Sequence, residues 1–123
     1  MPDPKRFPTV LLRHDLPGGS HHFDWMLALD DHGSLLTFRL DRDISLDAEP
    51  FEAEQLAGHR RAYLEYEGEV SGNRGTVVRV ASGHCDIHAR TDHSIELSLH
   101  LGVRHENLGG IRQKNGRFLF GSR

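Results

Sequence analysis

The sequence predicts a mainly β fold, a small antiparallel β-barrel of seven or eight strands with one or two short helices. Two observations support this fold class. Short runs suited to strands recur along the 123 residues, and clusters of Gly, Pro, Asn and Asp mark turns between them. Apolar and polar residues also alternate over 94–101, which is typical of a strand with one buried face. A chain of this length is expected to form one domain, residues 1–123.

In the first half, composition and turn signals predict three antiparallel strands followed by a loop and a helix. Helix formers dominate residues 51–56, which is why a helix is expected there. The expected order is a loosely held lead-in over 1–7, a strand over 8–14, a Pro-Gly-Gly turn over 16–20, a strand over 23–29, a turn over 30–33, a strand over 34–40, a surface loop over 41–50, and a short helix over 51–56 that ends near Gly58.

The second half is predicted to contain the remaining strands. Residues 76–80 are rich in β-branched side chains and give the clearest strand signal in the chain. The expected order is a strand over 62–66, a glycine-rich loop over 67–75, strands over 76–80, 84–90 and 94–101, and a closing hairpin of 108–111 with 117–120 around the turn Asn115-Gly116.

Composition limits the possible functions. The formal net charge of −3, from 15 basic and 18 acidic residues, argues against a protein that coats duplex DNA non-specifically. No apolar run is long enough to cross a membrane, and the start of the chain does not resemble a signal peptide, so we expect a cytoplasmic protein without a membrane partner. The single cysteine, Cys85, cannot form an internal disulfide and is expected to be buried.

The first predicted hairpin carries a candidate metal site. Strand alternation places His22 and Asp24 on one face and Trp25 on the opposite, core-facing side. His14 ends the preceding strand, so the hairpin brings it close to the same face. Two imidazoles and one carboxylate suit zinc, manganese or iron. The alternative interpretation is an exposed, solvated strand face, because a chain with 10 histidines will place some of them near one another by chance.

A second pair of candidate residues lies further along the chain. His59 and Tyr63 are four residues apart, a spacing that puts both side chains on one side of either a helix or a strand. An imidazole and a phenol together can donate hydrogen bonds to an anionic oxygen and stabilise developing charge. The alternative is a histidine at a helix end next to a half-buried tyrosine.

Several motifs in order resemble a known family. The motifs are Arg13-His14-Asp15, His22-Phe23-Asp24-Trp25-Met26-Leu27, His59-x-x-x-Tyr63, Tyr66-Glu67-Gly68-Glu69 and Gly72-Asn73-Arg74-Gly75. In order and approximate spacing they resemble the 3'-phosphoesterase domain of bacterial DNA ligase D, from about Val10 to Val80 and more weakly to the end.

The resemblance implies a β-barrel phosphoesterase that removes a 3'-ribonucleoside and then the 3'-phosphate at DNA breaks. It implies that His14, His22 and Asp24 hold a divalent metal, most often Mn²⁺, with Zn²⁺ or Co²⁺ as alternatives. It implies that His59 and Tyr63 face the phosphate, with His22 also at the catalytic centre. The expected partners are nucleic-acid 3' ends, of DNA or a DNA/RNA primer-template, and DNA-repair ligase or polymerase proteins.

The sequence departs from the family at Met26, where the family has an arginine that clamps the phosphate. We therefore expect Arg13, Arg39 or Arg74 to bind the phosphate instead. Two alternatives to an active phosphoesterase stay open. One is a non-catalytic barrel that binds nucleic-acid ends or a repair partner. The other is a non-haem iron oxygenase whose ligands are His22, Asp24 and His59.

Overall fold

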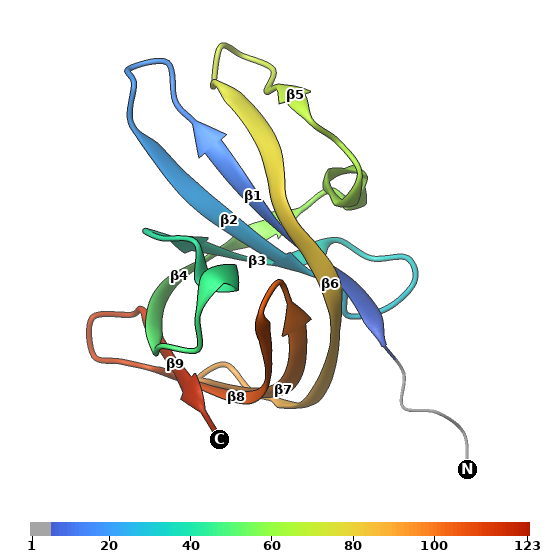
Figure 1. Cartoon of the computed structure of the whole chain (residues 1–123), viewed down its shortest axis with the longest axis vertical. Coiled ribbons are helices and arrows are strands. Elements are labelled where there is room, and N and C mark those ends of the chain that lie inside the picture. The colour runs from blue at the N-terminus through green and yellow to red at the C-terminus, as the bar shows by residue number, and fades with distance from the viewer. Residues whose placement is uncertain (1–5) are drawn as a thin grey trace.

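The computed structural model describes residues 6–123, and within this range the chain forms a closed antiparallel β-barrel (Figure 1). Eight strands follow one another around the barrel in the order β1-β2-β3-β4-β9-β8-β7-β6, and pairing of β1 with β6 closes it, while β5 adds a short ninth strand beside β6. The predicted fold class is confirmed. The strands are β1 (Phe7–Asp15), β2 (His21–Leu27), β3 (Leu35–Leu40), β4 (Phe51–His59), β5 (Gly68–Glu69), β6 (Thr76–Arg90), β7 (Ser94–Leu101), β8 (Arg104–Arg112) and β9 (Phe118–Ser122), and two 3-10 turns are η1 (Ile44–Leu46) and η2 (Arg61–Leu64).

The predicted first hairpin is confirmed. The amide of Leu16 donates to the carbonyl of Ser20 at 2.8 Å, and Gly19 adopts a positive φ of 94° that closes the turn. Of the expected lead-in over 1–7, residues 1–5 lie outside the described range. The lead-in prediction is wrong for Phe7, which already belongs to β1, pairs with Cys85 on β6 and is half-buried.

The helix expected over 51–56 is wrong, because these residues form most of β4. The side chains of Phe51 and Ala53 are buried, whereas Glu52 and Glu54 are exposed, which is the period of two of a strand. β4 pairs with β3 on one side and β9 on the other, so the barrel would be open without it. Inter-strand hydrogen bonds and burial of Phe51 therefore outweigh the helix propensity of the glutamates and alanine.

The strand expected over 62–66 is also wrong. Residues 61–64 form η2, in which the amide of Tyr63 donates to the carbonyl of Arg60 at 3.1 Å. β4 already pairs with β3 on one edge and β9 on the other, so the chain that follows His59 leaves the barrel. Tyr63 and Leu64 then pack against the outside of the barrel. Both 3-10 turns are short, and nowhere in residues 6–123 is there a helix with the length and hydropathy to cross a membrane.

The two strands expected over 76–80 and 84–90 are one continuous strand, β6, of 15 residues. Its first half pairs with β1 and its second half with β7. Gly83 on β6 pairs with Leu101 on β7, and a Cβ at Gly83 would collide with the carbonyl oxygen of His100. A long strand that passes from one neighbour to the other is thus possible because glycine has no side chain at this point. The strand over 94–101 and the closing hairpin of β8 with β9 are confirmed.

Two apolar clusters lie on opposite sides of β2. Trp25 is fully buried inside the barrel, with its ring 5.3 Å from the ring of Phe120, and its indole N–H donates to Thr9 at 3.0 Å. Met26 points the other way, into an outer apolar cluster made of Val10, Leu12, Met26, Ala28, Leu35, Val70 and Val77. Both faces of β2 are therefore covered, because Tyr63 and Leu64 of the segment around η2 pack on its outer side.

Cys85 is buried in the barrel core, as expected. Its side chain is 1% exposed, and this burial raises the pKa of its thiol to about 12. A thiol that stays protonated is neither a nucleophile nor a metal ligand near neutral pH.

Candidate metal centre

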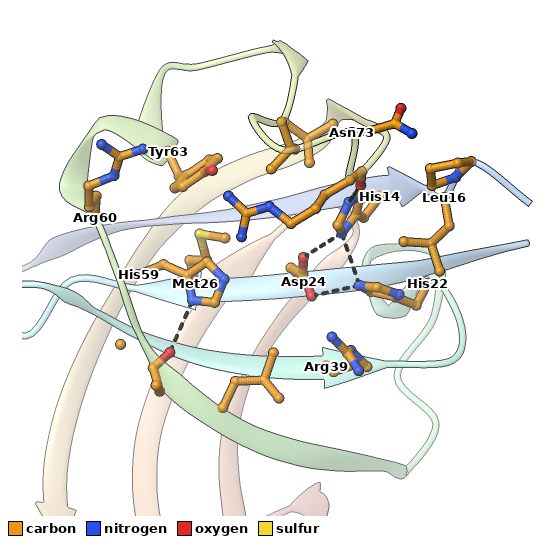
Figure 2. A pocket seen from close by; sticks show the side chains of 17 residues that line it. His14, Leu16, His22, Asp24, Met26, Arg39, His59, Arg60, Tyr63 and Asn73 are labelled. Atoms are coloured by element: carbon orange, nitrogen blue, oxygen red, sulfur yellow. Dashed lines mark hydrogen bonds and ion pairs between the residues drawn. The ribbon is translucent and has the colours of Figure 1, made fainter.

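A cavity of about 830 Å³ lies outside the barrel, over the outer face of β1, β2 and β3 (Figure 2). The opposite wall comes from the end of β4, from η2 and from the loop between β5 and β6. One part of the lining is polar and the other belongs to the outer apolar cluster. The lining residues are His14, Leu16, Pro17, His22, Asp24, Met26, Arg39, Leu56, Ala57, Gly58, His59, Arg60, Tyr63, Val70, Asn73, Arg74 and Val77.

His14, His22 and Asp24 meet in this cavity. His14 on β1 lies directly opposite His22 on β2, and Asp24 follows His22 by two residues on the same face. His14 Nδ1 lies 3.2 Å from His22 Nε2 and 3.6 Å from Asp24 Oδ2, and His22 Nε2 lies 3.3 Å from Asp24 Oδ1. The potential ligand atoms all lie within 4.8 Å of one another. The residues predicted to converge therefore do converge.

A hydrogen bond orients the ring of His14. Its Nε2 lies 2.7 Å from the carbonyl oxygen of Arg74, and because a carbonyl only accepts, Nε2 carries the proton. In the neutral ring, Nδ1 then has a free lone pair, and this is the atom that faces His22 and Asp24. Metal-binding histidines in proteins are commonly held in this way by a carbonyl on the second ring nitrogen.

Gly75 allows the loop that carries Arg74 to approach β1. Its φ is 92°, and a Cβ at this position would collide with the carbonyl oxygen of Asp15. Only glycine fits both the backbone angle and the close contact. This contact is next to Arg74, so Gly75 places the carbonyl that orients His14.

Asp24 fits a cation-binding role. The residue is 4% exposed, and among the described residues its Oδ1 makes no well-aligned hydrogen bond, with His22 Nε2 3.3 Å away. A buried carboxylate oxygen without a good hydrogen bond is costly, and a bound cation would remove that cost. Two imidazole nitrogens and a carboxylate oxygen form a donor set that suits Mn²⁺, Zn²⁺ or Co²⁺.

The surroundings of His22 favour its neutral form. Burial lowers the pKa of His22, and the positive charge of Arg39 and the neighbouring His14 act in the same direction, while Asp24 opposes them. A neutral imidazole is the form that binds metal, so the fold favours the ligating state of this residue.

His59 and Tyr63 lie together in the same cavity, with ring centroids 5.8 Å apart in an edge-to-face arrangement. His59 Nδ1 lies 3.0 Å from the carbonyl oxygen of Ala57 and donates to it, so Nε2 is the nitrogen left for a ligand. The group that could hold a metal ion consists of His14, His22 and Asp24, so its second histidine is His14 on β1. His59 is outside this group.

The three arginines expected to bind phosphate have different positions. Arg39 lies opposite Asp24 on β3 and lines the cavity, with no hydrogen bond or ion pair to its guanidinium within residues 6–123. Arg74 also lines the cavity, but its side chain donates to the carbonyl of Ser71 at 2.6 Å. Arg13 does not line the cavity, because it alternates with His14, and it pairs with Asp15 at 3.1 Å.

Sequence reasoning assigned no role to Arg60. This arginine precedes η2 and lines the cavity beside Tyr63 (Figure 2), and its guanidinium has no partner within the described part of the chain. Its position next to His59 in the sequence was the available signal. Met26 lies on the face of His22 and Asp24, as expected, and is 1% exposed.

No protein-family model matches this chain, and no curated protein matches it. The resemblance to the 3'-phosphoesterase domain of DNA ligase D therefore depends on the order and spacing of the motifs.

Proposed function

We propose that this protein is a metal-dependent phosphoesterase-like protein that acts on nucleic-acid 3' ends, with His14, His22 and Asp24 as the metal ligands. The observation that carries the proposal is the convergence of these ligand atoms within 4.8 Å in a cavity that also contains His59, Tyr63 and the cation Arg39. A cation site beside free phosphate-binding groups is the arrangement that phosphoryl transfer uses.

Each side chain has a distinct part in the proposed reaction. A divalent cation bound by the three ligands would supply Lewis-acid polarisation of a phosphoryl oxygen and activation of the water that attacks phosphorus as the ester bond breaks. Arg39 would bind a second phosphoryl oxygen through its guanidinium. The hydroxyl of Tyr63 would donate a hydrogen bond to the phosphoryl group, and His59, when protonated on Nε2, would give its proton to the leaving oxygen. DNA-repair proteins are the partners that we propose for such an enzyme.

The second candidate function is a non-catalytic barrel that binds nucleic-acid ends. The observation that favours it is Met26, a buried apolar side chain on the same strand face as Asp24. A thioether does not replace the charge-assisted hydrogen bonds of a guanidinium, each worth about 1.5–3 kcal/mol.

A turnover assay separates the two candidates. Purified protein and Mn²⁺ are incubated with a primer-template that ends in a 3'-ribonucleotide or a 3'-phosphate, and Mn²⁺ binding is measured by calorimetry. Asp24→Asn is compared with Asp15→Asn, a carboxylate on β1 outside the cavity. We expect turnover in the wild type and Asp15→Asn and neither turnover nor Mn²⁺ binding in Asp24→Asn. Mn²⁺ binding without turnover supports the non-catalytic barrel, and equal turnover in all three proteins refutes the assignment of Asp24.

A further inference from the structure

Three histidines form a row across the outer face of β6, β7 and β8. His84 pairs with His100, and His100 pairs with His105, so the three residues occupy directly opposed positions on neighbouring strands. The ring centroids of His84 and His100 are 4.5 Å apart, and those of His100 and His105 are 4.6 Å apart. None of them lines the cavity described above. We call this group the histidine row.

The row lies outside the barrel because its neighbours point inward. Cys85, Leu99 and Leu101 flank His84 and His100 in the sequence and are buried in the barrel core. Alternation along each strand therefore directs the three imidazoles outward. His84 and His100 are half-buried, and His105 is exposed. The row is thus a surface feature that solvent ions can reach.

Nitrogen atoms of the row are free to bind a ligand. His105 Nε2 lies 3.1 Å from the carbonyl oxygen of Gly102 and donates to it, which leaves a lone pair on Nδ1 of the neutral ring. His84 Nε2 is buried and has no hydrogen-bond partner among residues 6–123. A buried polar atom without a partner is uncommon in a folded protein and calls for a ligand, a water or a proton donor.

We propose that the histidine row is a second metal-binding site, selective for Zn²⁺, Ni²⁺ or Cu²⁺, in which His84, His100 and His105 are the ligands. The donor set is all imidazole, which suits these cations, whereas Mn²⁺ and Mg²⁺ prefer sites with oxygen ligands. The row differs in this respect from the cavity, which offers a carboxylate.

Chelation requires a small movement of His100. The rings of His84 and His100 are stacked, with 19° between their planes, so their lone pairs run side by side. A turn of the His100 ring about its Cβ–Cγ bond brings a nitrogen toward either neighbour, and this torsion is broad for histidine.

Calorimetry with two cations tests the proposal on the full chain. We expect two equivalents of Zn²⁺ but one of Mn²⁺ to bind the wild type. In the Asp24→Asn background, which disables the cavity, one Zn²⁺ and no Mn²⁺ should remain. Adding His100→Asn or His105→Gln to this background should weaken the remaining Zn²⁺ at least tenfold, because even loss of an outer partner of a ligand weakens binding about 10–100-fold.

An exposed histidine outside the row provides the control. His32→Gln removes an exposed histidine in the turn between β2 and β3 and should leave both equivalents in place. His105 is exposed, so His105→Gln is expected to fold, which circular dichroism would check. Zn²⁺ binding that is unchanged in both His100→Asn and His105→Gln would overturn the proposal, as would the absence of Zn²⁺ binding in the Asp24→Asn background. Neither outcome depends on turnover, so the test is independent of the proposed function.

Discussion

The imidazole of His14 donates a 2.7 Å hydrogen bond from Nε2 to the carbonyl oxygen of Arg74, a residue 60 positions later in the chain. This contact connects the β1–β2 hairpin to the loop between β5 and β6. It decides which nitrogen of His14 faces His22 and Asp24, and therefore whether three ligand atoms or only two point at one place.

Gly75→Ala is expected to weaken Mn²⁺ binding about 10–100-fold, the usual cost of disturbing an outer partner of a metal ligand. The added Cβ would collide with the carbonyl of Asp15, move the loop and remove the acceptor of His14. Calorimetry measures the affinity. Gly121→Ala is the matched control, because a Cβ there meets no atom within 4 Å. Equal affinities in the two variants would contradict the role given to this loop.

Acid is expected to destabilise the metal-free protein partly through His22. Since its pKa is lowered in the fold, the unfolded chain takes up the proton first as the pH falls below 6.5. The stability that His22 contributes is therefore present above pH 6.5 and lost as the pH falls through its folded pKa. Urea unfolding at a series of pH values would show a shallower acid slope in His22→Gln. An identical slope in both proteins would show that His22 does not titrate in this way.

Arg39→Gln is expected to raise the dissociation constant for an oligonucleotide with a 3'-phosphate about 10–100-fold, the loss of a charged hydrogen bond of about 1.5–3 kcal/mol. Arg13→Gln is the control, since Arg13 lies outside the cavity and pairs with Asp15. Fluorescence anisotropy in the presence of Mn²⁺ measures both. The prediction rests on the proposed function, and an equal loss in the two variants would indicate general charge attraction in place of a contact in the cavity.

Arg104→Met is expected to lower the free energy of unfolding by about 3–5 kcal/mol, because it leaves the half-buried carboxylate of Glu106 and the buried carbonyl of Ile44 without their partner. The Arg104 side chain is buried, donates to the carbonyl of Ile44 at 2.7 Å and pairs with Glu106 at 3.3 Å. Arg123→Met, which breaks an exposed pair with Glu96, should cost at most about 1 kcal/mol. Urea unfolding compares the two, and similar losses would argue against a structural role for Arg104.

The parts of this protein that the sequence determined are those set by neighbours along the chain. The turn over 16–20 joins two strands of alternating character, so the register of His14 with His22 and the face of Asp24 follow from local geometry. The alternation that separates Trp25 from Met26 is equally local. The same alternation puts Arg13, which is next to His14, on the opposite face of β1.

Only the tertiary structure decided the features that depend on distant partners. Residues 51–56 form a strand because β3 and β9 both need a neighbour, which outweighs local helix propensity. Residues 61–64 turn over the outer face of β2 because the closed barrel offers them no strand to pair with. The ring of His14 is oriented by a carbonyl 60 residues away. Hydrogen bonds and burial between segments far apart in the chain set these features, and no local pattern of residues encodes them.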